Sequence, residues 1–316
     1  MIIAALALAT ASPALGSADD ATLSPLNVRG LPFTRSYPLE EVGEMPRGAR
    51  LNFDQFGRLA VIYAGFYAVL NDTVWLDIAV KDEPLRVNMA QVVQAPDGRA
   101  YYCALGSWGT AEIGADGRLH AHSLVPPDAP KWALTTSFTE ALATKKGVYF
   151  SGWNGVIYWD FASQKTRFFN LTAVSTIFAI ADDVYASAHG QPLHRVDVEQ
   201  GILGRIEGTS FRGSAVDHAA VLDATHALIA ARNGELFVFD GRHATRWAMQ
   251  ERYNLTGRVL GLQHLVDGGV AVAISGKGLF FISPEGELLS ALTTTHYQRI
   301  TDIATREPGV LWVATE

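Results

Sequence analysis

The stretch Gly147–Phe161, GVYFSGWNGVIYWDF, decides the fold because it reads as two short strands joined by a tight turn. Tyr149, Phe150 and the run Val156–Trp159 are β-branched or aromatic, the residue types that suit a pleated, half-buried surface. Asn154-Gly155 lies in the turn, and Asn-Gly is a strong hairpin signal because both central residues of a type I′ turn need positive φ. The stretch therefore predicts a β-hairpin.

This hairpin pattern recurs along the chain. The second strand of each unit is predicted to start near Arg58, Arg99, Val148, Val184, Ala227, Val270 and Val310. The starts are about 35 to 50 residues apart, which is the range of propeller blades. Asp, Gly and Pro residues precede each start and supply turn geometry. Second hairpins follow several of them, with turns such as Asp116-Gly117 and Asp240-Gly241.

Four strands per unit, without a long amphipathic helix, predict an all-β chain that forms a β-propeller of about seven four-stranded blades. The alternative fold, an irregular β-sandwich, does not explain the spacing.

The N-terminal segment admits two interpretations. Residues 1–18 are predicted to be a signal peptide, because Ile2–Ala11 is apolar but too short to span a bilayer and cleavage near Ala18 would follow small residues. Lys or Arg is missing before the apolar run, which leaves an apolar N-terminal strand as the alternative. Residues 19–49 are predicted to be an extended lead-in with one strand around Leu31–Tyr37, and residues 50–316 to be the propeller.

The last blade is predicted to be incomplete. After the sixth unit only Arg299–Thr305 and Val310–Thr315 read as strands. The lead-in offers one further strand and the blade needs two, so an unpaired strand edge would be exposed. We therefore expect this chain to be the front part of a longer protein.

Composition excludes some classes of partner. The formal net charge of -7 argues against nucleic acid, which requires a basic surface, and no basic run predicts binding to an anionic membrane. No segment beyond the N-terminus is long and apolar enough for a transmembrane helix. Cys103 is the single cysteine and lies in an apolar run, so we expect a buried, inert thiol and no intrachain disulfide.

Several segments resemble a known repeat family. The C-terminal Leu311–Glu316, LWVATE, is similar to the LWVGT-type strand of the two-component-regulator propeller repeat. Val148–Asp160 and Leu236–Gly241 match the same repeat, in which a strand ends near Asp. The opening GLPFTRSYPLEEVG and the segment Asn52–Leu59 also resemble the N-terminal part of bacterial propeller sensors. The resemblance covers most of residues 30–316 and is weakest in the fourth and fifth units.

The resemblance implies an exported, periplasmic or extracellular sensor domain of a bacterial signalling protein. In that family the propeller precedes a β-sandwich, a transmembrane helix and an output module such as a histidine kinase. Kinase activity, homodimerisation and membrane attachment would then belong to downstream segments. The expected partner of this chain is a small molecule or an oligosaccharide, without a cofactor.

The turns between the second and third strands of the blades all lie on one face of a propeller. Aromatic and hydrogen-bonding side chains in these turns suit a sugar or a similar small molecule. The candidate ligand-binding residues are Phe66, Tyr67, Trp108, Trp153, Asn154, His189, Gln191, Arg232, Asn233 and Lys277. The alternative is that Trp108 and Trp153 pack between blades and that the polar residues only form turns.

Other chemistry is not indicated. His120 and His122 share one face of a predicted outer strand, but no third metal ligand is evident, so solvated histidines are expected. No phosphate-binding loop and no G-x-S-x-G nucleophile elbow is present. We expect a binding domain, not an enzyme. The alternatives are a secreted propeller enzyme of the lyase or glycosidase type, indicated by carboxylates or histidines around the channel, and a protein-interaction scaffold.

Overall fold

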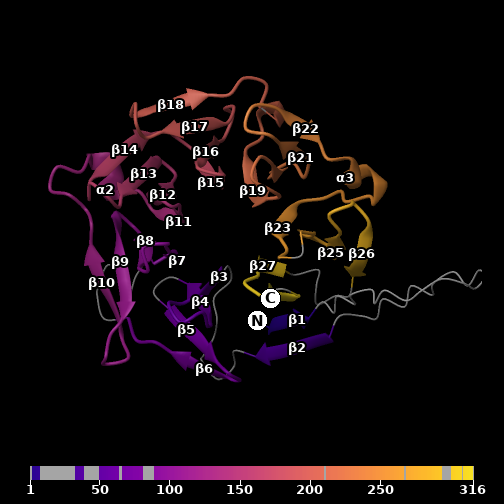
Figure 1. Ribbon diagram of the computed structural model, residues 1–316, viewed down its shortest axis with the longest axis horizontal. Coiled ribbons are helices and arrows are strands. Elements are labelled where there is room, and N and C mark those ends of the chain that lie inside the picture. The colour runs from indigo at the N-terminus through magenta and orange to yellow at the C-terminus, as the bar shows by residue number, and fades with distance from the viewer. Residues whose placement is uncertain are drawn as a thin grey trace, which may run out of the picture.

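The computed structural model describes residues 2–7, 33–38, 50–63, 66–80, 89–209, 211–266, 268–293, 300–307 and 309–315. The strands of these segments form seven four-stranded antiparallel sheets, arranged as blades around a central axis (Figure 1). This arrangement confirms the prediction of an all-β propeller.

Each blade is listed from its innermost to its outermost strand. Blade 1 contains β3 (Arg50–Phe53), β4 (Leu59–Tyr63), β5 (Phe66–Asn71) and β6 (Val74–Asp77). Blade 2 contains β7 (Gln91–Gln94), β8 (Ala100–Ala104), β9 (Ser107–Ile113) and β10 (Leu119–Ser123). Blade 3 contains β11 (Phe138–Ala143), β12 (Gly147–Gly152), β13 (Gly155–Asp160) and β14 (Thr166–Asn170).

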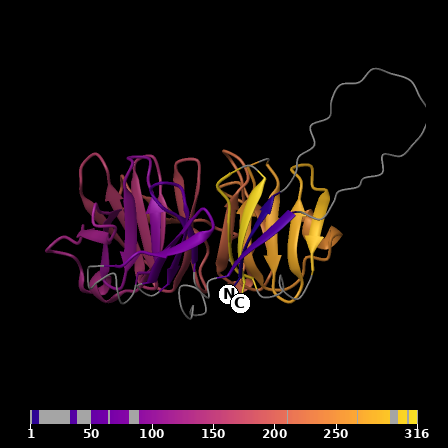
Figure 2. The same cartoon turned by 90° about the horizontal axis from the view of Figure 1, so that it is seen from below.

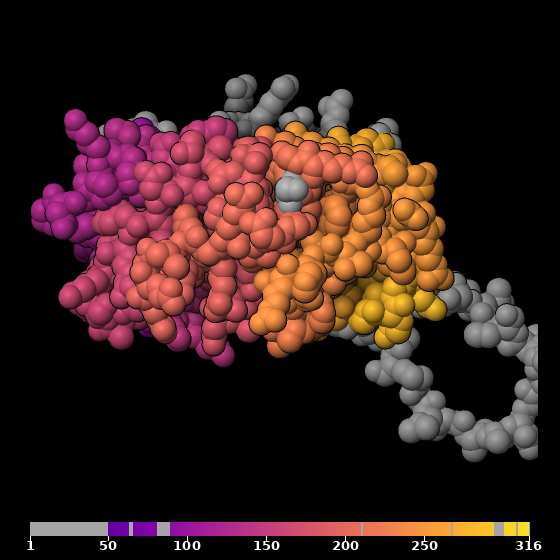
Figure 3. Space-filling model, turned by 90° about the horizontal axis from the view of Figure 1, so that it is seen from above, coloured from indigo at the N-terminus to yellow at the C-terminus, as the bar shows by residue number. Residues whose placement is uncertain are grey.

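The remaining blades follow in the same order. Blade 4 contains β15 (Val174–Ile180), β16 (Asp183–Ala188), β17 (His194–Asp197) and β18 (Ile202–Arg205). Blade 5 contains β19 (Val216–Val221), β20 (Ala227–Ala231), β21 (Leu236–Phe239) and β22 (Ala244–Arg246). Blade 6 contains β23 (Val259–His264), β24 (Val270–Ile274), β25 (Gly278–Ile282) and β26 (Leu288–Leu292). Figure 3 shows the consecutive blades along one flank, side by side.

Among the described residues, two short helices and one 3-10 turn lie in the connections between blades. They are α2 (Lys131–Thr135), α3 (Ala248–Arg252) and η2 (Phe211–Gly213). Each second strand begins within one residue of its predicted start, for example at Leu59, Ala100 and Val310. The blades in the region of weakest resemblance, 4 and 5, also have four strands each.

The turn of the β12–β13 hairpin differs from the prediction. Gly152 pairs with Gly155, so Trp153 and Asn154 are the central residues, one position earlier than an Asn-Gly turn requires. Neither has positive φ, so the turn is not of type I′. The following connection accounts for the difference, because the carbonyl of Trp153 accepts the N–H of Ala173 at 2.6 Å.

The seventh blade joins both ends of the chain. It contains β27 (Ile300–Ala304), β28 (Val310–Thr315), β1 (Ile2–Ala7) and β2 (Phe33–Pro38), in the sheet order β2-β1-β28-β27. As predicted, the C-terminal part supplies only two strands and the lead-in supplies one. The fourth strand is β1, which pairs with β28 from Ile2↔Thr315 to Ala7↔Val310, so the sheet is completed and the expected open edge is not present in it.

This pairing corresponds to the second of the two interpretations of the N-terminus. The structure uses Ile2–Ala7 as a strand, which is the alternative to a signal peptide over residues 1–18. Its apolar character suits a strand between two others, where both edges hydrogen-bond. Residues 8–32, including Ala18, lie outside the described part of the chain, so cleavage there stays a prediction.

The core lies between blades. The second strands of blades 2, 3, 5 and 6 are buried along their whole lengths, which explains their continuous apolar sequences. Cys103 is buried within β8, and this burial raises the pKa of its thiol to about 12, as expected for an inert cysteine.

Strand direction defines two faces of the disc seen in Figure 2. Each innermost strand begins on the same face that carries the turns between second and third strands, and we call this the entry face. The first-to-second and third-to-fourth turns lie on the opposite face. The pair Ile2↔Thr315 occupies the position of the second-to-third turn in blade 7, so both described chain ends lie on the entry face.

Candidate functional site

Trp153 and His189 form an exposed aromatic pair on the entry face. Trp153 is in the β12–β13 turn of blade 3 and is 57% exposed, and His189 follows β16 of blade 4. Their ring centroids are 5.8 Å apart with planes inclined by 38°. The connection between the blades holds them in register, because Ala173 donates to the carbonyl of Trp153 and accepts the N–H of His189. The structure therefore brings two predicted site residues from different blades together.

The other polar residues of the predicted set form hydrogen bonds to other protein groups. In blades 3, 4 and 6 the second-to-third turn contacts the connection that enters its own blade, whereas in blade 5 the contacts are to strand β19 and within the turn itself. The side-chain contacts are Asn154 Nδ2 to Thr136 Oγ1 at 3.0 Å, Gln191 Nε2 to the carbonyl of Thr172 at 3.3 Å, Arg232 Nε to Asp217 at 3.1 Å, Asn233 Nδ2 to Glu235 at 2.8 Å and Lys277 Nζ to Thr256 Oγ1 at 2.7 Å. Arg232 and Asn233 are also exposed to solvent, and Lys277 is half-buried.

Three predicted site residues belong to the core instead. Trp108 is fully buried and makes edge contacts with Phe138 at 5.6 Å and Phe168 at 6.0 Å, so it packs between blades 2 and 3. Tyr67 is 2% exposed, and burial raises the pKa of its hydroxyl. Phe66 packs against the cluster between blades 7 and 1. Strand alternation turns these aromatic rings toward the blade interfaces, which corrects the prediction for them.

A ring of seven equivalent positions surrounds the axis just inside the entry face. In blades 3 to 7 the register shifts near the start of the innermost strand, as at a β-bulge, and each ring residue follows the shift. In blades 1 and 2 the equivalent positions are identified by hydrogen bonds that repeat those of the other blades. These bonds run from the N–H of Leu51 to Asp302 and from the N–H of Ala141 to Gln91. The ring, which we call the axial ring, consists of Arg50, Gln91, Glu140, Thr176, His218, Gly261 and Asp302.

Side chains of the axial ring bond across the seams between blades. Glu140 Oε2 accepts the N–H of Ile177 in blade 4 at 2.9 Å, and Gln91 Oε1 accepts the N–H of Ala141 in blade 3 at 2.7 Å. Asp302 makes the equivalent bond to blade 1. Between blades 4 and 5 the neighbouring Ser175 takes this role and donates to the carbonyl of Val216 at 2.7 Å.

The carboxylates of the ring have their oxygens occupied. Those of Glu140 also accept hydrogen bonds from the hydroxyls of Thr176, at 2.9 and 3.0 Å, and Ser151, at 3.3 Å. Those of Asp302 accept the N–H groups of Leu51 and Ile303. Burial raises the pKa of both carboxyls, and the positive charge of Arg50 opposes this increase.

His218 is the titratable base of the ring. Burial lowers the pKa of its imidazole to about 4, opposed by the negative charge of Asp217, while Arg50 and Arg258 lower it further. It also hydrogen-bonds the backbone of Val259 in blade 6. Its imidazole is therefore neutral at pH 7.

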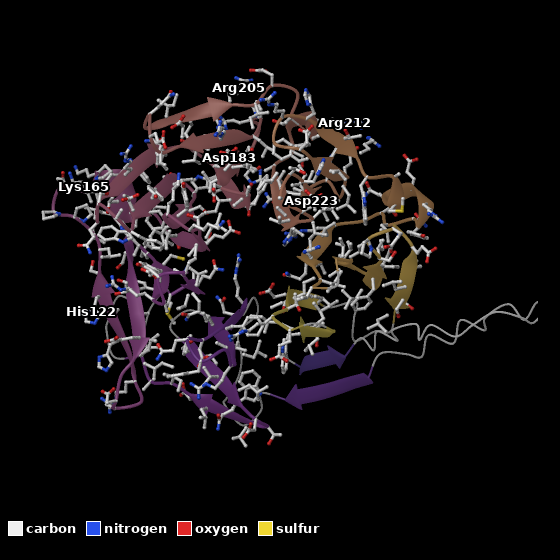
Figure 4. All side chains as sticks on the ribbon, in the orientation of Figure 1. His122, Lys165, Asp183, Arg205, Arg212 and Asp223 are labelled. Carbon is white, nitrogen blue, oxygen red and sulfur yellow. The ribbon has the colours of Figure 1, made fainter. Side chains whose placement is uncertain are left out.

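A prediction based on turn residues alone does not identify the axial ring. Its signal in blades 3, 4, 5 and 7 is a polar pair at the start of the innermost strand, before an apolar run: Thr139-Glu140, Ser175-Thr176, Asp217-His218 and Thr301-Asp302. The pattern is visible in the sequence, but its inward direction depends on the register shift. Figure 4 shows side chains projecting from the innermost strands toward the axis.

The predicted solvated histidines are on the rim. His120 and His122 lie on β10, the outermost strand of blade 2, and His122 is labelled at the edge of the disc in Figure 4. His120 contacts Asp116 at 2.9 Å, and His122 contacts Glu112 at 3.5 Å. Within the described residues no group of three or more His, Cys, Asp or Glu side chains is arranged to hold a metal ion.

Comparison with known proteins supports the fold. No family model matches the chain, and no curated protein matches it. Among solved structures it is similar to the extracellular domain of the hybrid two-component system BT3049 of B. thetaiotaomicron, with a TM-score of 0.62 at 13% identity over 86% of this chain and 40% of that one. The extracellular domain of the hybrid two-component system BT4673 of the same organism gives 0.64 at 12% identity, over 85% of this chain and 37% of that one.

Propellers of other classes are similar to the same degree. Virginiamycin B lyase from Staphylococcus aureus gives a TM-score of 0.62 at 11% identity, over 87% of this chain and 97% of the lyase. The chain thus spans about two fifths of the two-component domains and nearly all of the lyase. Among the described residues no helix has the length and hydropathy of a membrane span. These likenesses establish a β-propeller.

Proposed function

We propose that this chain is the ligand-sensing propeller domain of an exported bacterial signal-transduction protein, with a small molecule or a glycan fragment as its ligand. The observation that carries the proposal is the Trp153–His189 pair, whose tilted rings have centroids 5.8 Å apart on the entry face while Trp153 stays largely exposed. An exposed aromatic face costs free energy in water and suits the apolar face of a sugar ring.

The position of this pair also supports a binding role. It is contributed by two blades, so a ligand that contacts both rings would respond to their relative position. Small-molecule sites combine aromatic side chains with a few polar groups, and Gln191 lies two residues from His189 in the same turn.

The similar two-component domains support the sensing role and an extracytoplasmic location. Both are named as extracellular domains of signalling systems. In such a protein an output module and any membrane attachment would be supplied by other segments.

Substitution of Trp153 tests the proposal directly. We expect Trp153→Ala and His189→Ala to weaken binding of the ligand found in a glycan-fragment screen by about tenfold each, because stacking contacts contribute about 1 kcal/mol or more. Phe56→Ala is the matched control: Phe56 is 65% exposed and lies in the β3–β4 turn on the opposite face. Calorimetry that gives equal affinities for all three variants and the parent chain would remove the basis of the proposal.

A propeller enzyme is the second candidate, favoured by Glu140, His218 and Asp302 around the axis. A lyase or glycosidase needs a general acid or base near its substrate. Against this role, both carboxylates are held by backbone N–H groups across the seams. Turnover of a screened ligand that is lost in His218→Gln, with binding retained, would favour the enzyme over the sensor.

A further inference from the structure

Three large apolar side chains stay about half exposed on the described part of the entry face, and they lie on neighbouring elements. Leu105, in the β8–β9 turn of blade 2, is 49% exposed, and Leu134, in α2, is 48% exposed. Trp153 of blade 3 is the third. The second-to-third turns of blades 5 and 6 instead carry polar side chains such as Asn233 and Lys277. We call Leu105, Leu134 and Trp153 the apolar strip.

The β8–β9 turn packs directly on the end of α2. The N–H of Gly106 donates to the carbonyl of Thr136 at 2.7 Å, and Leu105 forms an antiparallel bridge with Ser137. A Cβ atom at Gly106 would lie 2.2 Å from the carbonyl oxygen of Leu134, so the two backbones are in close contact. Leu105 and Leu134 are therefore held side by side, although they belong to different blades.

The β12–β13 turn packs on the same segment from the other side. Asn154 Nδ2 donates to Thr136 Oγ1 at 3.0 Å, and a Cβ atom at Gly152 would lie 2.6 Å from Cγ2 of Thr136. Trp153 is between these two residues, so its ring starts next to Thr136. The strip is therefore continuous from blade 2 to blade 3, and the contact of Trp153 with His189 extends it to blade 4.

The strip offers apolar area and few free hydrogen-bonding groups. The carbonyl of Thr136 is occupied by Gly106, and that of Trp153 accepts the N–H groups of Ala173 and Val174 at 2.6 and 3.3 Å. An extended peptide needs free backbone groups of this kind. Three half-exposed side chains present roughly 300 Å² in all, well below the about 800 Å² per partner of a stable protein interface. The strip therefore fits the apolar part of a small ligand.

We propose that the ligand of this domain is a glycoside with an apolar aglycone, an alkyl or aryl group that lies on Leu105 and Leu134 while the sugar contacts Trp153 and His189. The inference rests on the proposed function for the sugar, but not for the apolar group. Contiguous exposed apolar surface marks binding sites. Each methylene that is fully removed from water raises affinity by up to about fourfold.

The test compares octyl β-D-glucoside, below its critical micelle concentration, with methyl β-D-glucoside, which has the same sugar. Calorimetry should show that the parent chain binds the octyl glucoside at least tenfold more tightly. Leu105→Ser and Leu134→Ser should each weaken its binding by about fivefold and leave that of the methyl glucoside unchanged. Val266→Ser is the matched control, because Val266 is 54% exposed in the β23–β24 turn of the opposite face.

Three results would overturn the apolar subsite: no binding of the octyl glucoside, an affinity for it that both leucine variants leave unchanged, or an equal loss in Val266→Ser. Melting temperatures equal to that of the parent chain would show that the variants are folded, as expected for exposed positions. The sensing proposal fails separately. If Trp153→Ala left both affinities unchanged while the leucine variants weakened octyl glucoside binding, the aromatic pair would lose its role and the subsite would stand.

Discussion

The carboxylate of Asp302 accepts a 2.8 Å hydrogen bond from the backbone N–H of Leu51, across 251 residues of sequence. The bond joins the innermost strand of blade 7 to that of blade 1, so it closes the inside of the ring. Its counterparts at Gln91 and Glu140 repeat the same side-chain-to-backbone contact in two other seams. Polar residues on innermost strands thus hold blades together where apolar side chains are few.

Removal of the Asp302 carboxylate should destabilise the propeller. Asp302→Ala leaves the N–H of Leu51 without an acceptor, and an unpaired buried donor costs about 1–3 kcal/mol. Urea unfolding would measure the loss. Asp77→Ala is the control, since Asp77 is exposed at the end of outermost strand β6. Equal stabilities of the two variants would show that the seam bond contributes nothing.

Glu140 should make the chain more stable in mild acid than at neutral pH. Burial raises the pKa of its carboxyl above the ordinary 4.5, so the folded state binds the proton more tightly than the unfolded state. The resulting contribution of Glu140 to stability is present below pH 4.5 and is lost as the pH rises through the pKa of the folded state. Glu140→Gln keeps one acceptor for Ile177 and removes the titration. Unfolding free energies of parent and variant should diverge as the pH rises, and parallel curves would contradict the prediction.

His218 should have the opposite effect on the pH dependence of stability, and make the chain less stable in acid than at neutral pH. Its pKa falls from 6.5 to about 4 on folding, mainly through burial, so the unfolded state binds the proton more tightly. Its contribution is complete above pH 6.5 and is lost as the pH falls toward 4. His218→Gln should flatten this part of the stability curve, whereas His122→Gln on the rim should not. The check is the difference in unfolding free energy between the His218→Gln variant and the parent chain across pH 4 to 7. A difference that does not change with pH would refute the assignment.

Alanine substitutions of Trp108 and Trp153 should have very different effects on stability. Trp108→Ala empties a buried position between Phe138 and Phe168 and should cost about 3–5 kcal/mol. Trp153→Ala removes a side chain that is 57% exposed and should change stability by less than about 1 kcal/mol. Chemical unfolding of both variants tests this, and a comparable loss in each would place Trp153 in the core.

A chain that starts at residue 19 should be less stable than the full chain. Without β1 the strand β28 loses one of its two partners, from Val310 to Thr315, and β2 loses its only neighbour in the sheet. The melting temperature of the two chains, with N-terminal sequencing of the exported protein, checks this. If the mature chain begins near residue 19 and melts at the same temperature, residues 2–7 serve as a signal and not as a strand.

Local patterns were sufficient to predict the blades. A few neighbouring residues determine the conformation of turns such as Asp116-Gly117 and of apolar strands such as Ala227–Ala231. The partner of β28 could not be predicted in this way, because Ile2–Ala7 is apolar in either interpretation and the pairing spans the whole chain.

The candidate site was predictable only in part. Trp153 and His189 were found because turn residues face solvent, whereas Trp108 was misplaced because its strand position turns the ring inward. The axial ring required the register shifts of innermost strands, and a shift by one residue reverses the face that every later side chain occupies.

The Ile2↔Thr315 pair sets the two ends of the backbone side by side, at the point where each of the other six blades has a turn. A loop of about two residues is enough to join such antiparallel neighbours. A chain closed there could be cut at any of the other six turns, and the blades would be synthesised in a new order. The ring itself assigns no blade the first place: a permuted chain would start at another blade and keep the same circular order.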